Sequence, residues 1–255
     1  MSAVSDYVSQ QSASMSAVEQ LPLMHSCECY NSRSIIRSGQ LEARMCKVFK
    51  ENLLYFFYGK PSYPVGEKVK GSRTDIEYCP VCFIVPMDRV AIYKAYPFDT
   101  GAFDANKYDA FTHRSMTLDD FELTTSCDGV LQYVKVFFGD NEHYIHGNTI
   151  VHEMHNVPCV DALTQILNAT GAFEIDERSH TVEIITRKNV SVKDSVECVI
   201  MPENLLRDAS TREFLDKNGI NHMEYTVRRL TAPSRYNEVV FEKAMEYIRM
   251  RKGDT

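Results

Sequence analysis

Two polar side chains occupy apolar strands, where a polar group needs a structural or chemical reason to be. Glu183 lies among apolar residues in the predicted strand 181–185, and His25 ends the predicted strand 20–25. A carboxylate in such surroundings is costly unless it faces a partner or a cleft. It could then stabilise positive charge or handle a proton. The alternative is that Glu183 faces solvent, because side chains alternate between the two faces of a strand.

Residues 53–63 combine aromatic rings with a cation. The first half of this stretch is continuously apolar, which predicts a strand covered on both faces, and the Gly59 and Pro61 that follow end it. Tyr55, Tyr58 and Lys60 then give an aromatic-walled turn with one positive charge. Such a turn suits a flat, anionic ligand such as a dinucleotide. The alternative is a core strand with an ordinary exit turn.

The elements that must position these residues are mostly strands. Because strands outnumber helices and do not alternate regularly with them, the pattern favours an α+β fold. Residues 1–20 are predicted to be a flexible tail and residues 21–255 a single domain, of which 206–255 form a C-terminal helical extension. The further predicted strands are 78–86, 90–93 and 196–202; the predicted helices are 31–37, 160–167, one opening at 202–206 and 239–250; residues 130–138 are a strand or a buried short helix.

Composition limits the class of protein. The 255 residues are sufficient for a sizeable core, and the net charge of −7 argues against a general polyanion binder. No apolar run approaches the length of a membrane-spanning helix, so we expect no membrane association. No secretory signal is evident, which predicts a cytoplasmic protein whose eight cysteines are thiols.

Two other groups of residues offer alternatives. Cys79 and Cys82 form a C-x-x-C and Cys27 and Cys29 a C-x-C, and with the histidines at 143, 146, 152 and 155 they could build a zinc-stabilised binding module. The weakness of this hypothesis is that Cys79 and Cys82 lie in an apolar strand. Basic residues near the C-terminus form either a solvated face or a phosphate-binding patch: Arg228, Arg229, Arg235, Arg249, Arg251 and Lys252.

Several short motifs, taken in order, resemble the ADP-ribosyltransferase superfamily, nearest to the DarT-type toxins that modify nucleic acid and similar phage-defence proteins. They are Leu23-Met24-His25, Ile35-Ile36-Arg37-Ser38-Gly39-Gln40-Leu41, residues 54–63, Asp176-Glu177-Arg178, Thr181-Val182-Glu183-Ile184 and Cys198-Val199-Ile200-Met201-Pro202. The resemblance covers roughly residues 21–206 and rests on the order of these motifs.

The resemblance implies a split, mostly antiparallel sheet with peripheral helices, which grips NAD, the substrate, in a cleft. Glu183 would be the catalytic carboxylate. Lys60 stands where DarT-type proteins usually carry an arginine, so it keeps the charge but loses the bidentate fork. The cofactor-binding residues would be His25 at the nicotinamide ribose, the backbone at Ser26 at its amide, Tyr55 or Tyr58 as the wall of the nicotinamide, and Tyr63.

By the same resemblance, Asp176, Glu177 and Arg178 would meet the acceptor. The implied activity is transfer of ADP-ribose to a nucleic-acid base, in DNA or RNA, by a toxin or phage-defence effector. Such a protein could have an antitoxin or chaperone partner. The enzymatic alternatives are a protein ADP-ribosyltransferase and an NAD glycohydrolase. The segment from Pro97 to Phe103 is also typical of the family, and we expect it to shape the cleft, with Asp99 a minor candidate for ligand contact.

Overall fold

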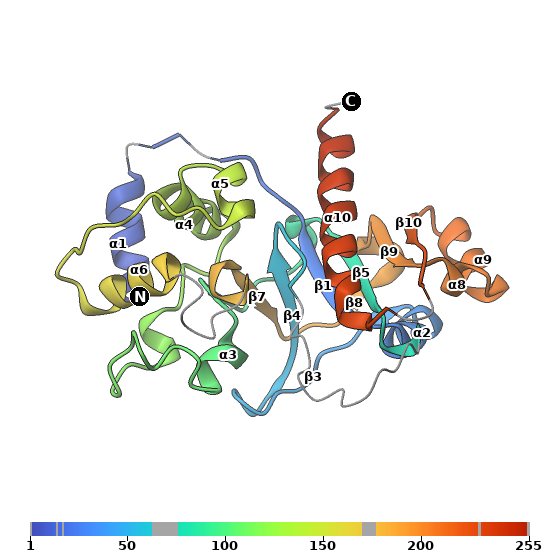
Figure 1. The fold of residues 1–255 in the computed structure, drawn as a ribbon, viewed down its shortest axis with the longest axis horizontal. Coiled ribbons are helices and arrows are strands. Elements are labelled where there is room, and N and C mark those ends of the chain that lie inside the picture. The colour runs from blue at the N-terminus through green and yellow to red at the C-terminus, as the bar shows by residue number, and fades with distance from the viewer. Residues whose placement is uncertain are drawn as a thin grey trace. The chain divides into compact units, whose positions relative to one another are not determined.

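A computed structural model describes residues 2–13, 15–16, 18–62, 76–169, 177–228 and 231–253 (Figure 1). The chain divides into two compact units, where the sequence predicts one domain. Unit 1 comprises Met1–Leu21, Met45–Tyr55 and Ala91–Thr186; unit 2 comprises Pro22–Arg44, Phe56–Val90 and Arg187–Thr255. Strand β4, Asn52–Tyr58, passes from one unit to the other. Strand β3, Arg44–Met45, lies at a unit boundary.

Unit 2 is built on an open sheet in the order β10-β9-β5-β1-β4. Only β9 and β10 pair in parallel; the other neighbours are antiparallel, which confirms an α+β fold with a mostly antiparallel sheet. Its strands are β1 (Leu23–Glu28), β5 (Pro80–Val85), β9 (Cys198–Pro202) and β10 (Asn221–Tyr225), and β2 (Gln40–Leu41) pairs separately with β8 (Val190–Ser191).

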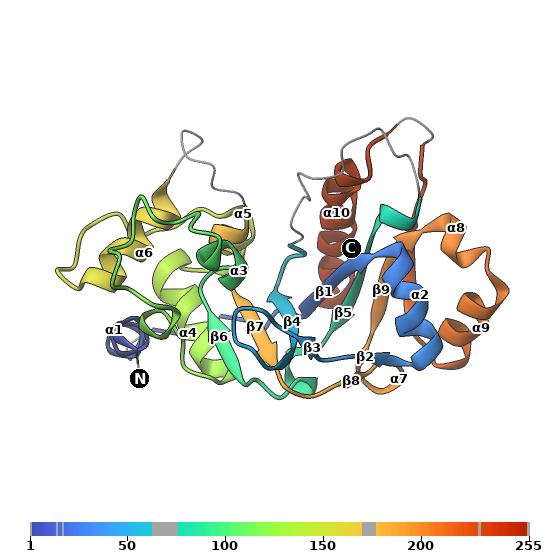
Figure 2. The ribbon, with the colours of Figure 1, turned by 90° about the horizontal axis from the view of Figure 1, so that it is seen from below.

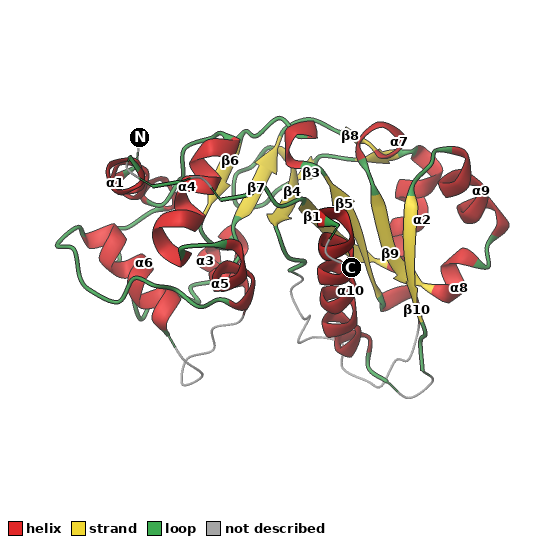
Figure 3. Cartoon of the chain, turned by 90° about the horizontal axis from the view of Figure 1, so that it is seen from above, coloured by secondary structure: helices red, strands yellow, loops and turns green. Residues whose placement is uncertain are grey.

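Helices cover both faces of the unit 2 sheet. All six residues of β5 are buried, because α10 (Tyr236–Lys252) and α2 (Cys29–Ser38) both pack against it (Figure 3). This accounts for the continuous apolar run in its sequence. The remaining helices of the unit are α7 (Val192–Ser195), α8 (Glu203–Leu206) and α9 (Ala209–Lys217), with short 3-10 turns η1 (Ile76–Tyr78), η2 (Met87–Arg89) and η5 (Pro233–Arg235).

Unit 1 is mainly helical around the antiparallel pair β6 (Lys94–Tyr96) and β7 (Glu183–Thr186), which places Tyr96 opposite Glu183 (Figure 2). Buried rings of Phe98, Tyr108 and Phe121 pack together beside this pair. The helices are α1 (Ala3–Ser12), α3 (Thr100–Asp104), α4 (Cys127–Phe138), α5 (Asn141–His146) and α6 (Pro158–Asn168), with 3-10 turns η3 (Leu118–Asp120) and η4 (Glu177–His180).

The structure differs from the sequence prediction at both ends of the chain. Residues 3–12, predicted as part of a flexible tail, form α1, which packs on α4 and α6 and buries Val4 and Val8. Two valines spaced by one helical turn give too weak a pattern to identify in a Ser- and Gln-rich segment. The predicted helical extension, residues 206–255, also contains β10, which completes the unit 2 sheet.

The structure also corrects the sequence prediction at one central segment and decides between its two alternatives at another. The strand predicted at 90–93 lies further along the chain, as β6. Residues 130–138 are helical, within α4, which begins after Ser126 caps it through a hydrogen bond from the Gly129 N–H to Oγ at 3.0 Å. Among the described residues, no helix is both long and apolar enough to cross a membrane.

Gly129 allows α4 to pack closely on the preceding segment. A Cβ added at this position would lie 2.3 Å from the backbone oxygen of Thr124, far inside contact distance. We therefore expect Gly129→Ala to lower the free energy of unfolding by about 1–3 kcal/mol, as overpacked sites do. Urea denaturation measures this directly.

Gly219→Ala serves as the matched control, because nothing lies within 4 Å of the added Cβ and only the positive φ of +64° is strained. That cost is about 1 kcal/mol. Equal losses in the two variants would show that close packing at Gly129 is not the constraint.

Candidate functional site

Glu183 begins β7 in unit 1 and is buried. Its exposed fraction is 3 %, and all four residues of the strand are buried. The alternative in which this carboxylate alternates out to solvent is therefore wrong. Both faces of β7 lie inside the protein, so a carboxyl here requires polar partners in the interior.

Thr100, the first residue of α3, supplies those partners. Its hydroxyl donates to Glu183 Oε2 at 2.6 Å, and its backbone N–H donates to the same oxygen at 3.3 Å. Among the hydrogen bonds of the described residues, the other oxygen of Glu183, Oε1, has no partner. The side chain is thus held at one oxygen, and the second remains available to accept or donate another hydrogen bond.

Asp99 places Thr100 at the start of the helix. Its Oδ1 accepts from the Ala102 N–H at 3.0 Å, which caps α3. Its Oδ2 forms an ion pair with Arg178 Nη1 at 3.4 Å, and its backbone N–H donates to the Arg178 carbonyl at 3.1 Å. The Asp-Thr segment is therefore connected to the turn η4 that precedes Glu183 in the chain.

These surroundings make Glu183 a weak acid. Burial, and secondarily the negative charge of Asp99, raise the pKa of Glu183 to about 8, while the two hydrogen bonds from Thr100 act in the opposite direction. A carboxyl group with this pKa is mostly protonated at pH 7. It becomes ionised near pH 8, or when a cation approaches it.

Tyr55, also in unit 1, lies within the electrostatic influence of this group. Its hydroxyl donates to Cys46 Sγ at 2.7 Å. Its pKa is raised, chiefly by burial, then by that hydrogen bond and then by the negative charge of Glu183. Five polar side chains of unit 1 thus form one cluster, which we call the Glu183 cluster: Tyr55, Asp99, Thr100, Arg178 and Glu183.

Other predicted site residues belong to unit 2. His25 is half-buried on β1, with its ring 5.8 Å from that of Phe56 between centroids, and Ser26 pairs with Cys82 of β5. Tyr58 is completely buried, and Lys60 is 4 % exposed, so its side chain lies in the interior rather than on an open turn. Gly59 has a φ of +69°, which forms the turn between these two residues.

The predicted acceptor residues lie before Glu183 in the chain. Glu177 begins η4, where its side chain is exposed and its carbonyl accepts from Thr181 Oγ1 at 2.8 Å. Arg178 is the ion-pair partner of Asp99. Tyr63 and Asp176 lie outside the described residues.

Sequence reasoning missed Thr100 as a partner of Glu183 and underrated Asp99. The only local signal was the Asp-Thr-Gly sequence at 99–101, which reads equally well as a self-contained turn. Its contact with a carboxylate 83 residues further along the chain becomes visible only in the tertiary structure.

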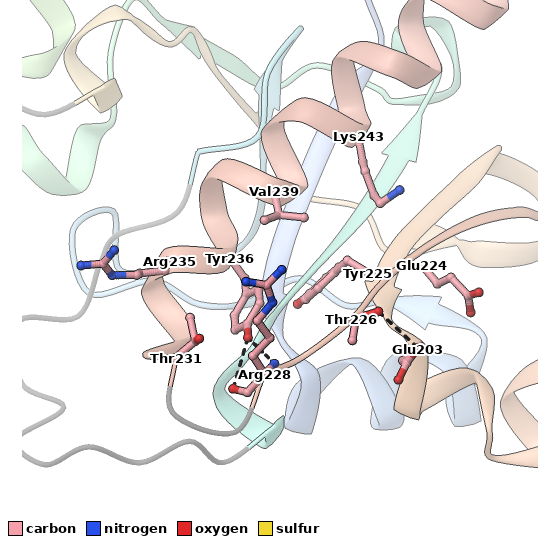
Figure 4. A pocket seen from close by; sticks show the side chains of 10 residues that line it. All are labelled: Glu203, Glu224, Tyr225, Thr226, Arg228, Thr231, Arg235, Tyr236, Val239 and Lys243. Carbon is pink, nitrogen blue, oxygen red and sulfur yellow. Dashed lines mark hydrogen bonds between the residues drawn. The ribbon is translucent and has the colours of Figure 1, made fainter.

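Unit 2 contains a separate pocket of about 750 Å³ between β10, α8 and the start of α10 (Figure 4). Two of the basic residues noted in the sequence, Arg228 and Arg235, line it together with Lys243. Arg251 instead forms an ion pair with Glu197 at 3.4 Å. The remaining lining residues are Glu203, Glu224, Tyr225, Thr226, Thr231, Tyr236 and Val239.

The cysteines of the proposed zinc module lie on neighbouring buried segments around the β1–β5 pair, where the Cys29 N–H donates to the Cys79 carbonyl at 2.8 Å. Cys27, Cys29, Cys79 and Cys82 are buried thiols. Over the described ranges, no three His, Cys, Asp or Glu side chains gather in an arrangement that could hold a metal ion.

Comparison with known proteins adds no assignment. No protein-family model matches the chain, and no curated protein matches it.

The raised pKa of Glu183 predicts a pH-dependent stability. Between about pH 4.5 and about pH 8 the folded protein holds a proton on Glu183 that the unfolded chain has lost, so stability falls as pH rises. Glu183→Gln removes this dependence. We expect the free energy of unfolding of the variant, relative to the native protein, to rise by up to roughly 1.4 kcal/mol per pH unit across this range.

Urea denaturation at several pH values between 5 and 9 measures the effect. Glu242→Gln is the control, because this carboxylate is exposed on α10. The buried, protonated carboxyl would be contradicted if the free energies of unfolding of Glu183→Gln and of the native protein changed with pH in parallel.

Proposed function

We propose that this protein is an NAD-dependent ADP-ribosyltransferase with Glu183 as its catalytic carboxylate. The observation that supports the proposal is the buried Glu183 carboxyl, held by Thr100 at one oxygen and unpartnered at the other among the described residues. Its position in the sequence is also the one at which the resemblance to ADP-ribosyltransferases requires a carboxylate.

The chemistry requires a carboxylate of this kind. Cleavage of the bond between nicotinamide and ribose builds positive charge on the ribose ring. A fixed carboxylate stabilises that charge, as carboxylates do at the oxocarbenium-like transition states of glycosidases. Thr100 fixes Glu183 at Oε2, so Oε1 can hydrogen-bond a ribose hydroxyl.

The pKa of about 8 is compatible with this role. A protonated carboxyl is inexpensive to bury before the substrate binds. NAD carries a cationic nicotinamide ring, and a positive charge near a carboxyl favours its ionised form. Binding of the substrate would thereby help to generate the charged group that the reaction uses.

The remaining roles follow from the resemblance. His25 would contact the nicotinamide ribose, the backbone at Ser26 would bind the amide, and Tyr55 or Tyr58 would wall the nicotinamide. Tyr63 would be a further cofactor-binding residue. Lys60 would balance the pyrophosphate or orient the acceptor.

The acceptor side of the reaction also follows from the resemblance. Asp176, Glu177 and Arg178 would contact the acceptor, which we propose to be a nucleic-acid base. The protein would then act as a toxin or phage-defence effector in the cytoplasm, with an antitoxin or chaperone as a further partner.

Labelled NAD tests the activity. Incubation with RNA, DNA and protein mixtures should label nucleic acid and release nicotinamide. Glu183→Gln should reduce nicotinamide release at least about 100-fold while the fold survives, because removing one preorganised charge-stabilising group costs roughly this much.

Glu142→Gln, an exposed carboxylate of α5, should retain full activity. Label on protein alone, or nicotinamide release without transfer, would change the acceptor to protein or water. Absence of nicotinamide release from the folded native protein would refute the enzyme.

The pH profile tests the environment of Glu183. If ionised Glu183 is required in the free enzyme, kcat/KM for nicotinamide release should increase about tenfold per pH unit up to about pH 8 and then level off. Asp99→Asn should shift the inflection to lower pH, because a neighbouring negative charge is removed. Thr100→Val should shift it to higher pH, because a hydrogen bond to the ionised form is lost.

Circular dichroism of both variants checks that the fold is retained. Inflections that coincide in the native enzyme and in both variants would show that the titrating group is not Glu183.

A further inference from the structure

The pocket of unit 2 is walled by α8, β10 and α10. Tyr236, Val239 and Lys243 are spaced by three and four residues, which places them on one face of α10 (Figure 4). Glu224 on β10 and Arg228 in the segment that follows it line another side, with Glu203 of α8 below. The pocket is therefore framed by regular elements on most sides.

The floor of the pocket is rigid. Tyr225 and Tyr236 stack with ring centroids 5.3 Å apart, and each is 4 % exposed. The Tyr225 hydroxyl donates to the Pro80 carbonyl at 2.6 Å, and the Tyr236 oxygen accepts from the Arg228 N–H at 2.6 Å. The backbone that carries Arg228 is thereby fixed before any ligand arrives.

Three cations line this pocket, in a chain whose net charge is −7; Arg235 and Lys243 lie at opposite ends and Arg228 between them (Figure 4). Within the described part of the chain, Arg228, Arg235 and Lys243 form no ion pair. Cations that are not neutralised by the protein are suited to bind an anion from solution.

The two acidic residues of the pocket differ from each other. Glu203 is engaged by Arg207 at 3.1 Å and by the Thr226 hydroxyl at 3.4 Å. Glu224 has no such partner among the described residues and lies at the opposite end of the pocket from Arg235 (Figure 4). Lys243 lies at the same end as Glu224, so cations line both ends of the pocket and one end also offers a carboxylate acceptor (Figure 4).

We propose that this pocket binds a phosphorylated ligand of the nucleotide class. Arg228, which lies between Arg235 and Lys243 (Figure 4), would hold its phosphates through a bidentate guanidinium contact, and Arg235 and Lys243 would add positive charge from the two ends of the pocket. Glu224 would accept hydrogen bonds from ribose hydroxyls, a role that acidic residues have in nucleotide sites. The volume of about 750 Å³ lies within the range of small-molecule sites. The proposal is independent of the NAD chemistry assigned to Glu183.

Isothermal titration calorimetry with ADP tests the proposal. Lys243→Glu and Arg235→Glu should each weaken ADP binding about tenfold or more, corresponding to about 1.4 kcal/mol. Lys217→Glu makes the same charge change at an exposed position of α9 outside the pocket, and should leave ADP affinity unchanged. Thermal denaturation of each variant confirms that the fold is retained.

Two further titrations test the ligand class. Glu224→Ala should weaken ADP about fivefold while leaving inorganic pyrophosphate unaffected, because only ADP carries ribose hydroxyls. A 5′-phosphorylated single-stranded oligonucleotide that displaces ADP would identify a strand end as the natural source of the phosphate. Failure to displace bound ADP would identify a free nucleotide.

The proposal is overturned if the native protein does not bind ADP. It is also overturned if Lys243→Glu, Arg235→Glu and Lys217→Glu change ADP affinity equally. The second result would place the ADP site outside this pocket, and a loss of ADP affinity in Glu183→Gln would then locate it at the Glu183 cluster. Pyrophosphate binding as tight as ADP would overturn the role of Glu224 and with it the nucleotide class.

Discussion

The hydrogen bond from the Thr100 hydroxyl to Glu183 satisfies the most demanding polar group in unit 1. A buried carboxyl without partners costs several kcal/mol, and the next two residues of its strand, Ile184 and Ile185, are apolar. The first residue of α3 meets this demand with two donors. The position of α3 beside β7 is therefore part of what allows an acidic residue to exist in that strand at all.

That bond depends in turn on Asp99 and Arg178. Asp99 caps α3 and so aims the first N–H and hydroxyl of the helix, while its ion pair with Arg178 connects the cap to the turn before β7. The same Asp99 contributes to raising the pKa of Glu183. Asp99 thus positions the donor, Thr100, and also changes the acidity of the acceptor, Glu183. The hydrogen bonds from Thr100 lower the pKa of Glu183, whereas the negative charge of Asp99 raises it.

Unit 2 stabilises polar groups in a different way. Its sheet is covered on both faces by helices, and three of its cations line the pocket beside β10 and α10. There the stacked Tyr225 and Tyr236 form a solid support, so charged side chains can remain at the surface with their backbone fixed. The interior of unit 1 holds the carboxyl of Glu183 in its protonated form, whereas the pocket of unit 2 presents cations that form no ion pair within the described residues.

The sequence by itself determined the apolar strands β4, β5 and β9, the α+β class and the polar character of Glu183 within an apolar strand, because these follow from local patterns of residue type. It could not determine helix α1, where Val4 and Val8 become apolar anchors only against α4 and α6. Nor could it determine that residues 130–138 are helical. The partners of Glu183 and the presence of Arg228, Arg235 and Lys243 around one pocket were decided by the tertiary structure alone. The physical reason is that hydrogen bonds and charge clusters join residues distant along the chain, whereas strand and helix patterns arise from neighbours.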